Sequence, residues 1–572
     1  MITEIHRKIR QLAGDPVLRR WLIGRLLGRW PGEPSFEAHR PPYLTEFLPL
    51  ELEDADKNYP GAAPGQPEGR IDIRLAGEKL MLDASGSEAF FQRTFADIET
   101  LLAMHRFAWL PLMGAAADPA WVGILWQAWR SNYGEPSGDW AWHPYTAAER
   151  AVNILAFARR HGLPGDNADT VRVLAAHATV IADRLEYFGD HHTSNHLSNN
   201  GRGLYLLGLE LKLDKAASLG AEILCHEFER IFSAEGVLRE GSSHYQLLLT
   251  RNYAEAWLAA KRYERKEASM LKEFTLKALS AANAMTLPGG MPLIGDLSPD
   301  CSPAWLSGLL PGGTGGWLAG LVEDDVRAFL DLRRQIAPAS SVALSAAGWH
   351  RLALGPFSML AHVAPGGWSH MPGHGHQDIG GFELHYENEP VIVDPGRGSY
   401  GEEGEAAYYR SGAAHNGLMV DHASSFPPSR PYYDETFRRK IGGPVPQVEI
   451  ETDTMTLVHH GFSRFPGVGA HKRCWHFAGN RLCVDDDLAG HSRHDLVRTI
   501  ITPLKPRCVD GAIVLAGQQK EYRLSWQGDV NKMSIEPVTC WHSYGAGTAA
   551  HAIRMKKCVS LPWRGGFSLE CL

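Results

Sequence analysis

The densest group of side chains that could carry out chemistry lies between residues 370 and 415. Its members are His370, His374, His376, Asp378, Asp394 and His415. Side chains alternate along an extended chain, so His374 and His376 would point to the same face. Imidazole and carboxylate groups are typical zinc ligands, and the sequence therefore suggests a metal site. The alternative is that these histidines sit in loops and satisfy hydrogen bonds, because their spacing matches no short metal motif.

A second polar group spans residues 190–201, DHHTSNHLSNNG. If this segment is helical, Asn195 and Asn199 share one face, and so do His192 and His196, because each pair lies four residues apart. Helix capping accounts for some of the Asn, Ser and Asp residues. It does not account for the three histidines, which makes the segment a candidate for the site.

A third group, REGSSHYQ, covers residues 239–246 and leads into a helical pattern that carries Tyr253. Tyr245 and Tyr253 are eight residues apart, about two helical turns, so both could face a shared site. The alternative is that each tyrosine is buried and hydrogen-bonded through its hydroxyl for structural reasons.

These groups fall on two parts of the chain with different periodicity. Apolar residues recur with helical spacing from about residue 96 to 334, whereas short β-branched segments bounded by Gly, Pro or Asn follow residue 340. We therefore predict a multidomain α+β protein. The predicted divisions are a partly irregular N-terminal extension at 1–90, a helical domain at 91–338 and an antiparallel β-sandwich at 339–572.

Composition narrows the class of partner. The formal charge is −8 and no Lys/Arg run is present, which argues against nucleic acid. The 17 Trp and 17 Tyr residues suit stacking against sugar rings. We find no run of 18 apolar residues and no secretory signal in the N-terminal sequence, which has the pattern of a short basic amphipathic helix. The default expectation is a cytoplasmic protein without a membrane span, with a periplasmic location as the alternative.

The order of the motifs resembles the heparinase II/III superfamily of polysaccharide lyases. The motifs are Asn195-His196, Glu240-x-Ser242-x-x-Tyr245, His374-x-His376-x-Asp378, Asp394-x-Gly396, Tyr408-Tyr409-Arg410-Ser411 and Ala414-His415-Asn416. The resemblance implies an incomplete (α/α) toroid followed by an antiparallel β-sandwich. It also implies cleavage of a uronic-acid-containing acidic polysaccharide by β-elimination.

The resemblance also implies roles for individual residues. Asn195 would neutralise the uronate carboxyl group, and His196 would share that role or act as the base. Tyr245 would be the general acid and a candidate base, with His374 as its partner in proton transfer. The metal ligands would be His376, Asp394 and His415, and they would hold a mainly structural Zn²⁺. Contacts to the polysaccharide are expected from Asn199, Tyr253, Trp140, Trp142, Tyr408, Tyr409 and Arg410, with Tyr253 competing with Tyr245 for the catalytic role.

The sequence departs from the family pattern at Gln246, where a histidine is usual, and at Gly417, where threonine or serine is usual. The lack of a secretory signal would fit the branch linked to exopolysaccharide or capsule metabolism. Two alternatives stay open: a non-catalytic polysaccharide-binding protein on the same fold, and a glycoside hydrolase using Glu240, Asp296 and Asp300. The hydrolase is the weaker prediction, because these carboxylates are not expected near the His and Tyr groups.

Overall fold

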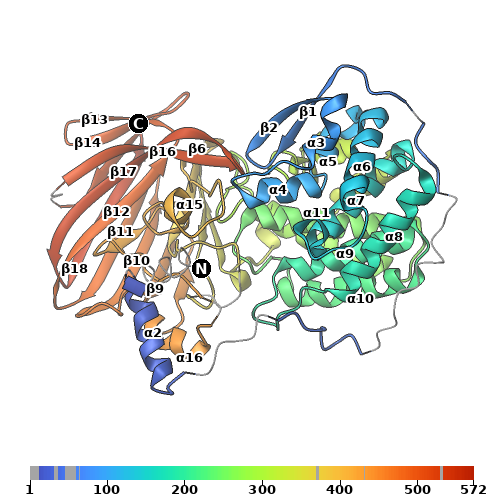
Figure 1. The fold of residues 1–572 in the computed structure, drawn as a ribbon. Helices are drawn as coiled ribbons and strands as arrows, with labels where there is room; N and C mark the ends of the chain where they lie inside the picture. Colours follow the sequence, from blue (N-terminus) through green and yellow to red (C-terminus); the bar gives the residue numbers. More distant parts are fainter. Residues whose placement is uncertain are drawn as a thin grey trace.

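The computed structural model describes residues 12–13, 15–30, 37–45, 59–63, 65–368, 373–430, 432–528 and 532–572. His370 and part of the predicted N-terminal helix lie outside these residues. Figure 1 shows helices gathered on one side of the molecule and strands on the other.

The helical region follows a short antiparallel hairpin of β1 (Arg70–Leu75) and β2 (Glu78–Asp83). Its helices are α3 (Ser87–Phe90), α4 (Ile98–His105), α5 (Trp109–Met113), α6 (Pro119–Tyr133), α7 (Pro144–His161), α8 (Asn167–Asp183), α9 (Asn195–Glu210), α10 (Asp214–Ile231), α11 (Ser243–Arg262), α12 (Ala268–Met285), α13 (Gly316–Gly320) and α14 (Glu323–Arg333). Several begin at a side-chain cap that satisfies free backbone N–H groups: Asp118 caps α6, Asp166 caps α8 and Ser242 caps α11.

Helices α9 and α11 are buried along nearly their whole length, which places them at the centre of this region. Helix α9 packs closely on α10 at two glycines. A Cβ atom on Gly208 would lie 2.2 Å from the backbone nitrogen of Ala217, and one on Gly220 would lie 2.4 Å from that of Tyr205. Only glycine allows this approach, so these two residues fix the distance between the helices.

The described residues of the strand region form three antiparallel sheets. One holds β3 (Trp349–Leu354), β4 (Phe357–His362), β5 (Gly381–Tyr386) and β6 (Glu389–Ile392). A second has the order β16 (Lys532–Ser543), β17 (Ala546–Ser560), β12 (Arg493–Thr502), β7 (Leu418–Val420). The third has the order β13 (Lys505–Val509), β14 (Ala512–Ala516), β15 (Glu521–Trp526), β18 (Trp563–Cys571), β11 (Arg481–Gly490), β10 (Val468–Ala478), β9 (Thr454–His459), β8 (Gln447–Ile450).

Burial alternates along β11, as expected for a strand with one face on the core. Residues from all three sheets form one buried apolar cluster that includes Phe357, Trp475 and Ile553. Two helices accompany the sheets, α15 (Gly404–Arg410) and α16 (Glu435–Gly442). The N-terminal helix α2 (Pro16–Leu26) lies beside α16 (Figure 1), where Trp21 joins an apolar cluster with Phe437.

This architecture confirms the predicted fold class, a helical region followed by antiparallel sheets. The change from helices to strands falls between Arg333 and Trp349, on either side of the predicted division at 338/339. The described parts of the predicted extension at 1–90 pack on different regions of the protein. Helix α2 packs on the strand region, whereas the β1–β2 hairpin packs on α4 and α5. Among the described helices, none combines the length and apolar character that a membrane crossing requires.

A buried cluster of charges lies inside the strand region around Asp486. This carboxylate is fully buried and accepts hydrogen bonds from Arg473 Nε at 2.7 Å, from Arg498 Nη2 at 2.8 Å and from His471 Nε2 at 2.9 Å. Arg473 also donates to the carbonyl oxygens of Gly380 and Asn416, so the cluster ties β10 to two loops. A charge this deeply buried is tolerated only while its partners stay in place.

We expect Asp486→Ala to destabilise the protein by about 3–5 kcal/mol, because two buried guanidinium groups would lose their counter-charge. The matched control is Asp487→Ala. Asp487 is the next residue on the same strand, but its partner is the exposed guanidinium of Arg564 at 3.0 Å. Exposed ion pairs contribute little, so the control should melt close to the wild type. Thermal unfolding followed by circular dichroism measures both, and equal melting temperatures for the two variants would contradict the assignment.

Candidate active site and metal centre

The predicted site residues converge where the helical and strand regions meet. The backbone fixes this junction: the N–H of His374 donates to the carbonyl of Glu240 at 2.7 Å, and the N–H of Asp296 donates to the carbonyl of His374 at 2.8 Å. Gly295 lies beside these bonds with a φ of +86°, and a Cβ atom there would lie 2.8 Å from the carbonyl oxygen of His374. The strand-region loop that carries His374 is therefore held directly by the helical region.

Tyr245, on the first turn of α11, stacks on the imidazole ring of His374. The ring centroids are 3.5 Å apart and the planes differ by 11°. The hydroxyl of Tyr245 lies 2.7 Å from that of Tyr400, and Tyr400 also donates to the carbonyl of Leu297 at 3.1 Å. Three ionisable side chains from three segments thus share one small site.

Asp296 is the charged centre of this junction. Its carboxylate accepts hydrogen bonds from His376 Nε2 at 2.9 Å and Arg397 Nη1 at 3.0 Å, and it lies 3.3 Å from His374 Nδ1. Burial alone would raise the pKa of Asp296, but the bonds from His374 and His376 and the charge of Arg397 hold it well below its usual range. Asp296 is therefore a permanent anion that orients both histidines.

The pKa of Tyr245 is shifted in the opposite direction, upward. Its burial is the largest cause that raises its pKa well above the ordinary value, and the carboxylates of Asp300 and Asp296 act in the same direction, although the hydrogen bond with Tyr400 opposes them. Tyr245 is thus held in the neutral, proton-carrying form at neutral pH.

Glu240 connects this group to Asn195 at the start of α9. One carboxylate oxygen, Oε1, accepts the backbone N–H of Asn195 at 2.7 Å, and the other, Oε2, lies 3.6 Å from His374 Nε2. Burial raises the pKa of Glu240, while the charge of His374 lowers it. The side-chain oxygen of Asn195 is buried and finds no hydrogen-bond partner in the described part of the chain, so its amide group has unused bonding capacity.

His196 follows Asn195 and remains partly exposed. Its Nδ1 lies 2.7 Å from Oε1 of Glu186, a carboxylate that also accepts from Asn200 at 3.0 Å. Burial works against the charged imidazole, yet the Glu186 carboxylate raises the pKa of His196 overall. His196 therefore favours the cationic form more than a free histidine does.

The predicted metal ligands His376, Asp394 and His415 do come together, with one donor atom from each lying within 4.8 Å of the others. Nδ1 of His376 and Nε2 of His415 are buried and find no hydrogen-bond partner among the described residues. Buried nitrogens without partners are costly, and a bound cation would satisfy both. Asp296 holds the opposite nitrogen of His376, an arrangement that commonly orients a metal-binding imidazole. These residues fit a metal ion.

Several predicted substrate contacts lie away from this centre. Tyr253 is fully buried, and its hydroxyl donates to the carbonyl of Leu224 at 2.9 Å. Trp142 is also fully buried and donates through Nε1 to the carbonyl of Tyr133. Asn199 is buried and accepts from a guanidinium within the helical region. These contacts give the three side chains structural roles.

The other predicted contacts divide between the surface and the strand region. Trp140 is half exposed and lies beside His143, a position open to a sugar ring. Arg410 forms a bidentate salt bridge with an exposed glutamate, Glu402. Tyr408 bonds Arg554, and Tyr409 is buried and accepts the backbone N–H of Thr539.

The structure corrects one expectation and adds residues that the sequence did not single out. Glu240 and Asp296, which were expected to lie apart from the histidine and tyrosine groups, contact His374 directly. Tyr400 had no predicted role, although it follows the ligand Asp394 by only six residues. Glu186 and Arg397 complete the site, and no local pattern marks either of them.

Comparisons with known proteins identify relatives of this fold. Residues 336–557 match the family model described as "Heparinase II/III-like, C-terminal". Among solved structures the chain is similar to heparinase III, with 16% identity, a TM-score of 0.63 and coverage of 84% of this chain and 79% of that chain. A mutant heparan sulfate lyase HepC from Pedobacter heparinus is 16% identical, with a TM-score of 0.54 and coverage of 94% of this chain and 86% of that chain. A heparinase III gene product is 15% identical, with a TM-score of 0.55 and coverage of 86% of this chain and 83% of that chain. No curated protein matches. At these identities the likeness shows the fold, which is that of heparinase III.

We expect the purified wild-type protein to contain about one equivalent of a divalent transition metal, with zinc favoured by the nitrogen and carboxylate ligands. His415→Ala should lose it, as measured by inductively coupled plasma mass spectrometry after dialysis. The matched control is His494→Ala, because His494 and Asp421 form another close pair at 2.7 Å, the distance found for His415 and Asp394. Metal retained by His415→Ala, or lost equally from both variants, would contradict the site.

Proposed function

We propose that this chain, whose residues 336–557 belong to the heparinase II/III-like C-terminal family, is a polysaccharide lyase that cleaves a uronic-acid-containing polysaccharide by β-elimination. The observation that carries the proposal is the stack of Tyr245 on His374, with Asp296 at the imidazole and Tyr400 at the phenol. It places a neutral proton donor, Tyr245, beside an oriented candidate base, His374. Elimination requires both a general acid and a general base.

In the proposed reaction, His374 takes the proton from C5 of the uronate. Asp296 lies 3.3 Å from its Nδ1 and Glu240 lies 3.6 Å from its Nε2, and these two carboxylates hold the imidazole against the ring of Tyr245. The electrons of the C5–H bond form the C4–C5 double bond as the bond from C4 to the glycosidic oxygen breaks. Tyr245 donates its proton to that leaving oxygen. After the products leave, His374 releases the proton it took from C5 and Tyr245 takes one up from water, which restores the resting state.

The uronate carboxyl group must be neutralised while charge develops on it. Asn195 and His196 lie at the first turn of α9, whose N-terminal N–H groups are already bonded in part by Glu240, so the neutralisation must come from the two side chains. His196, whose pKa Glu186 raises, supplies positive charge, and the side-chain NH2 group of Asn195 would donate a hydrogen bond. The same arrangement explains why His196 suits this role better than that of the base.

The carboxylates fit a hydrolase less well. A glycoside hydrolase needs one carboxyl group that carries a proton. The pKa of Asp296 is held far below its usual range. The pKa of Asp300 is also lowered, since the charge of Arg106 and the hydrogen bonds from Tyr145 and Arg106 together outweigh its burial. Glu240 keeps a raised pKa, but it is buried and one of its oxygens is bonded to Asn195.

The metal has a supporting role in this proposal. A zinc ion held by His376, Asp394 and His415 would join the segments that bear His376 and Asp394, which neighbour the segments of His374 and Tyr400. It would position these side chains rather than take part in proton transfer.

Tyr245→Phe should abolish the rise in absorbance near 232 nm that β-elimination produces, because the leaving oxygen loses its proton donor. We expect a fall in kcat of about 10²–10⁴-fold, the usual contribution of general acid–base catalysis. Tyr253→Phe is the matched control: it removes a hydroxyl from a buried tyrosine of the same helix that bonds a backbone carbonyl, and kcat should stay within a few-fold of the wild type.

The assay uses wild type and both variants with a panel of uronate polymers. A loss of activity in Tyr253→Phe together with retained activity in Tyr245→Phe would reverse the assignment of the acid. Binding of the polymers without any rise in absorbance for the wild type would replace the lyase by the non-catalytic polysaccharide-binding protein.

Glu186→Gln should lower the pKa of His196. The cationic form of His196 exists below that pKa, so the part of kcat/KM that depends on it is lost as pH rises through the pKa. In the variant this loss should begin at lower pH, while the acid limb of the profile stays in place. Glu402→Gln, which removes a carboxylate bonded to Arg410, is the control. An unchanged alkaline limb in Glu186→Gln would remove His196 from the proposed role.

A further inference from the structure

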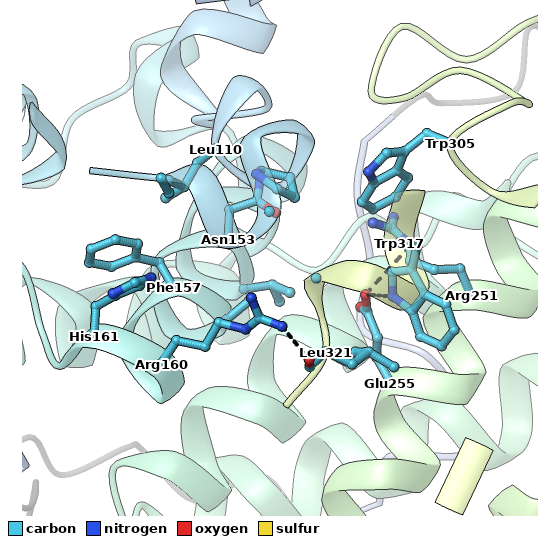
Figure 2. Close-up of a pocket in the computed structure, with 16 residues that line it drawn as sticks. Leu110, Asn153, Phe157, Arg160, His161, Arg251, Glu255, Trp305, Trp317 and Leu321 are labelled. Carbon is cyan, nitrogen blue, oxygen red and sulfur yellow. Dashed lines mark hydrogen bonds and ion pairs between the residues drawn. The ribbon is translucent and has the colours of Figure 1, made fainter. Parts of the chain in front are cut away.

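A small side pocket lies inside the helical region, between α5, α7, α11 and α13. Its volume is about 60 Å³ and its walls are mainly apolar. Figure 2 shows Leu110 and Phe157 on one side and Trp305 and Trp317 on the other. Nothing in the proposed reaction uses this pocket.

Among the described residues that line the pocket, Arg251 and His161 have buried side-chain nitrogen atoms without a hydrogen-bond partner. Arg251 is only 3% exposed, and its Nε and Nη2 atoms find no hydrogen-bond partner among the described residues. The nearest carboxylate is that of Glu255, whose Oε1 lies 3.9 Å from Nε (Figure 2). Glu255 is already engaged by Arg202 at 2.6 Å and by Trp317 Nε1 at 2.8 Å. A buried guanidinium with free N–H groups is costly unless a ligand or water accepts from them.

The charges behind Arg251 pair off, because Arg202 bonds both Glu149 and Glu255 at 2.6 Å. The other guanidinium that lines the pocket, Arg160, donates to the carbonyl oxygens of Ala319 and Leu321. A carbonyl oxygen of a ligand can accept from Arg251 in the same way. The apolar walls require that the rest of the ligand be apolar as well.

The size of the pocket limits the ligand further. A volume of 60 Å³ exceeds the roughly 10–15 Å³ that one water needs, but it is well below the roughly 150 Å³ cavity that holds a benzene ring. A whole sugar ring does not fit, whereas a substituent of a few heavy atoms does. A short acyl group meets both requirements, a carbonyl oxygen and an apolar end.

The pocket adjoins a larger hollow, and one wall residue of that hollow contacts Tyr400 of the proposed site. Trp305 lines both this pocket and a larger hollow of about 800 Å³, which is also lined by Asp300 and Tyr544. The hydroxyl of Tyr544 accepts the backbone N–H of Tyr400. Arg251 follows Tyr245 by six residues on α11, about 9 Å along the helix. A polymer lying in the larger hollow can therefore direct a substituent past Trp305.

We propose that this side pocket binds the acetyl group of an O- or N-acetylated sugar in the polymer. The methyl group packs among the apolar walls and the carbonyl oxygen accepts from Arg251. The inference rests on the proposed function for the identity of the polymer, but the pocket itself can be tested without turnover.

The test is saturation-transfer difference NMR on the full-length protein with N-acetyl-D-glucosamine, 6-O-acetyl-D-glucose and D-glucosamine. We expect the strongest transfer at the acetyl methyl group and little to D-glucosamine, and the stronger of the two acetylated sugars identifies the linkage. Ala156→Phe should abolish the methyl signal, because Ala156 is exposed at the pocket and a phenyl group would fill it. Ala168→Phe, the same change at an exposed position of α8, should keep the signal. Melting temperatures confirm that both variants fold.

Equal transfer to the acetylated and unacetylated sugars, or a methyl signal that survives Ala156→Phe, would overturn the inference. A second readout is kcat/KM on any polymer that the protein cleaves, compared between its acetylated and deacetylated forms. Ala156→Phe should reduce the ratio of these two values about tenfold, which is the lower end of the discrimination that an apolar pocket gives for one small group. A methyl signal without any lyase activity would support the acetyl pocket and contradict the proposed function. Lyase activity without a methyl signal would support the proposed function and contradict the acetyl pocket.

Discussion

The structure of the site depends on the buried carboxylate of Asp296. It belongs to the helical region, yet its partners His374, His376 and Arg397 all come from the strand region. A buried anion is stable only when it is matched by donors, so the two regions cannot separate here without exposing an uncompensated charge. The position of the proposed base, the orientation of a metal ligand and the closure of the junction follow from this one requirement.

Glu240 repeats the arrangement on the other side of His374. Its carboxylate sits at the N-terminus of α9, where it accepts the N–H of Asn195, and its backbone carbonyl accepts the N–H of His374. An anion at a helix N-terminus is favourable, which helps to hold this buried side chain in place. The imidazole of His374 thus lies between two carboxylates and against the ring of Tyr245. The helical region fixes its position although the residue belongs to the other region.

The sequence allowed prediction of the fold class, because apolar periodicity is a local property. The family resemblance also grouped His376, Asp394 and His415, whose donor atoms lie within 4.8 Å of one another. The choice between Tyr245 and Tyr253 was open, since both lie on α11 and eight residues bring a helix only roughly back to the same face. The structure places Tyr245 at the junction and Tyr253 against the carbonyl of Leu224. Asp296 and Tyr400 could not be assigned from the sequence, because their contacts depend on how two loops from separate regions meet.

The interior of the helical region shows why its central helices carry so many polar residues. Helices α9 and α11 are buried almost throughout, yet they hold Arg202, Arg251 and Glu255. Such buried pairs add little to stability compared with apolar packing. They do fix the directions of side chains inside a helical ring, and here they leave the N–H groups of Arg251 free beside an apolar pocket. The same helix presents Tyr245 six residues earlier, about 1.7 turns, so the geometry of α11 sets the distance between the proposed bond cleavage and the proposed acetyl pocket.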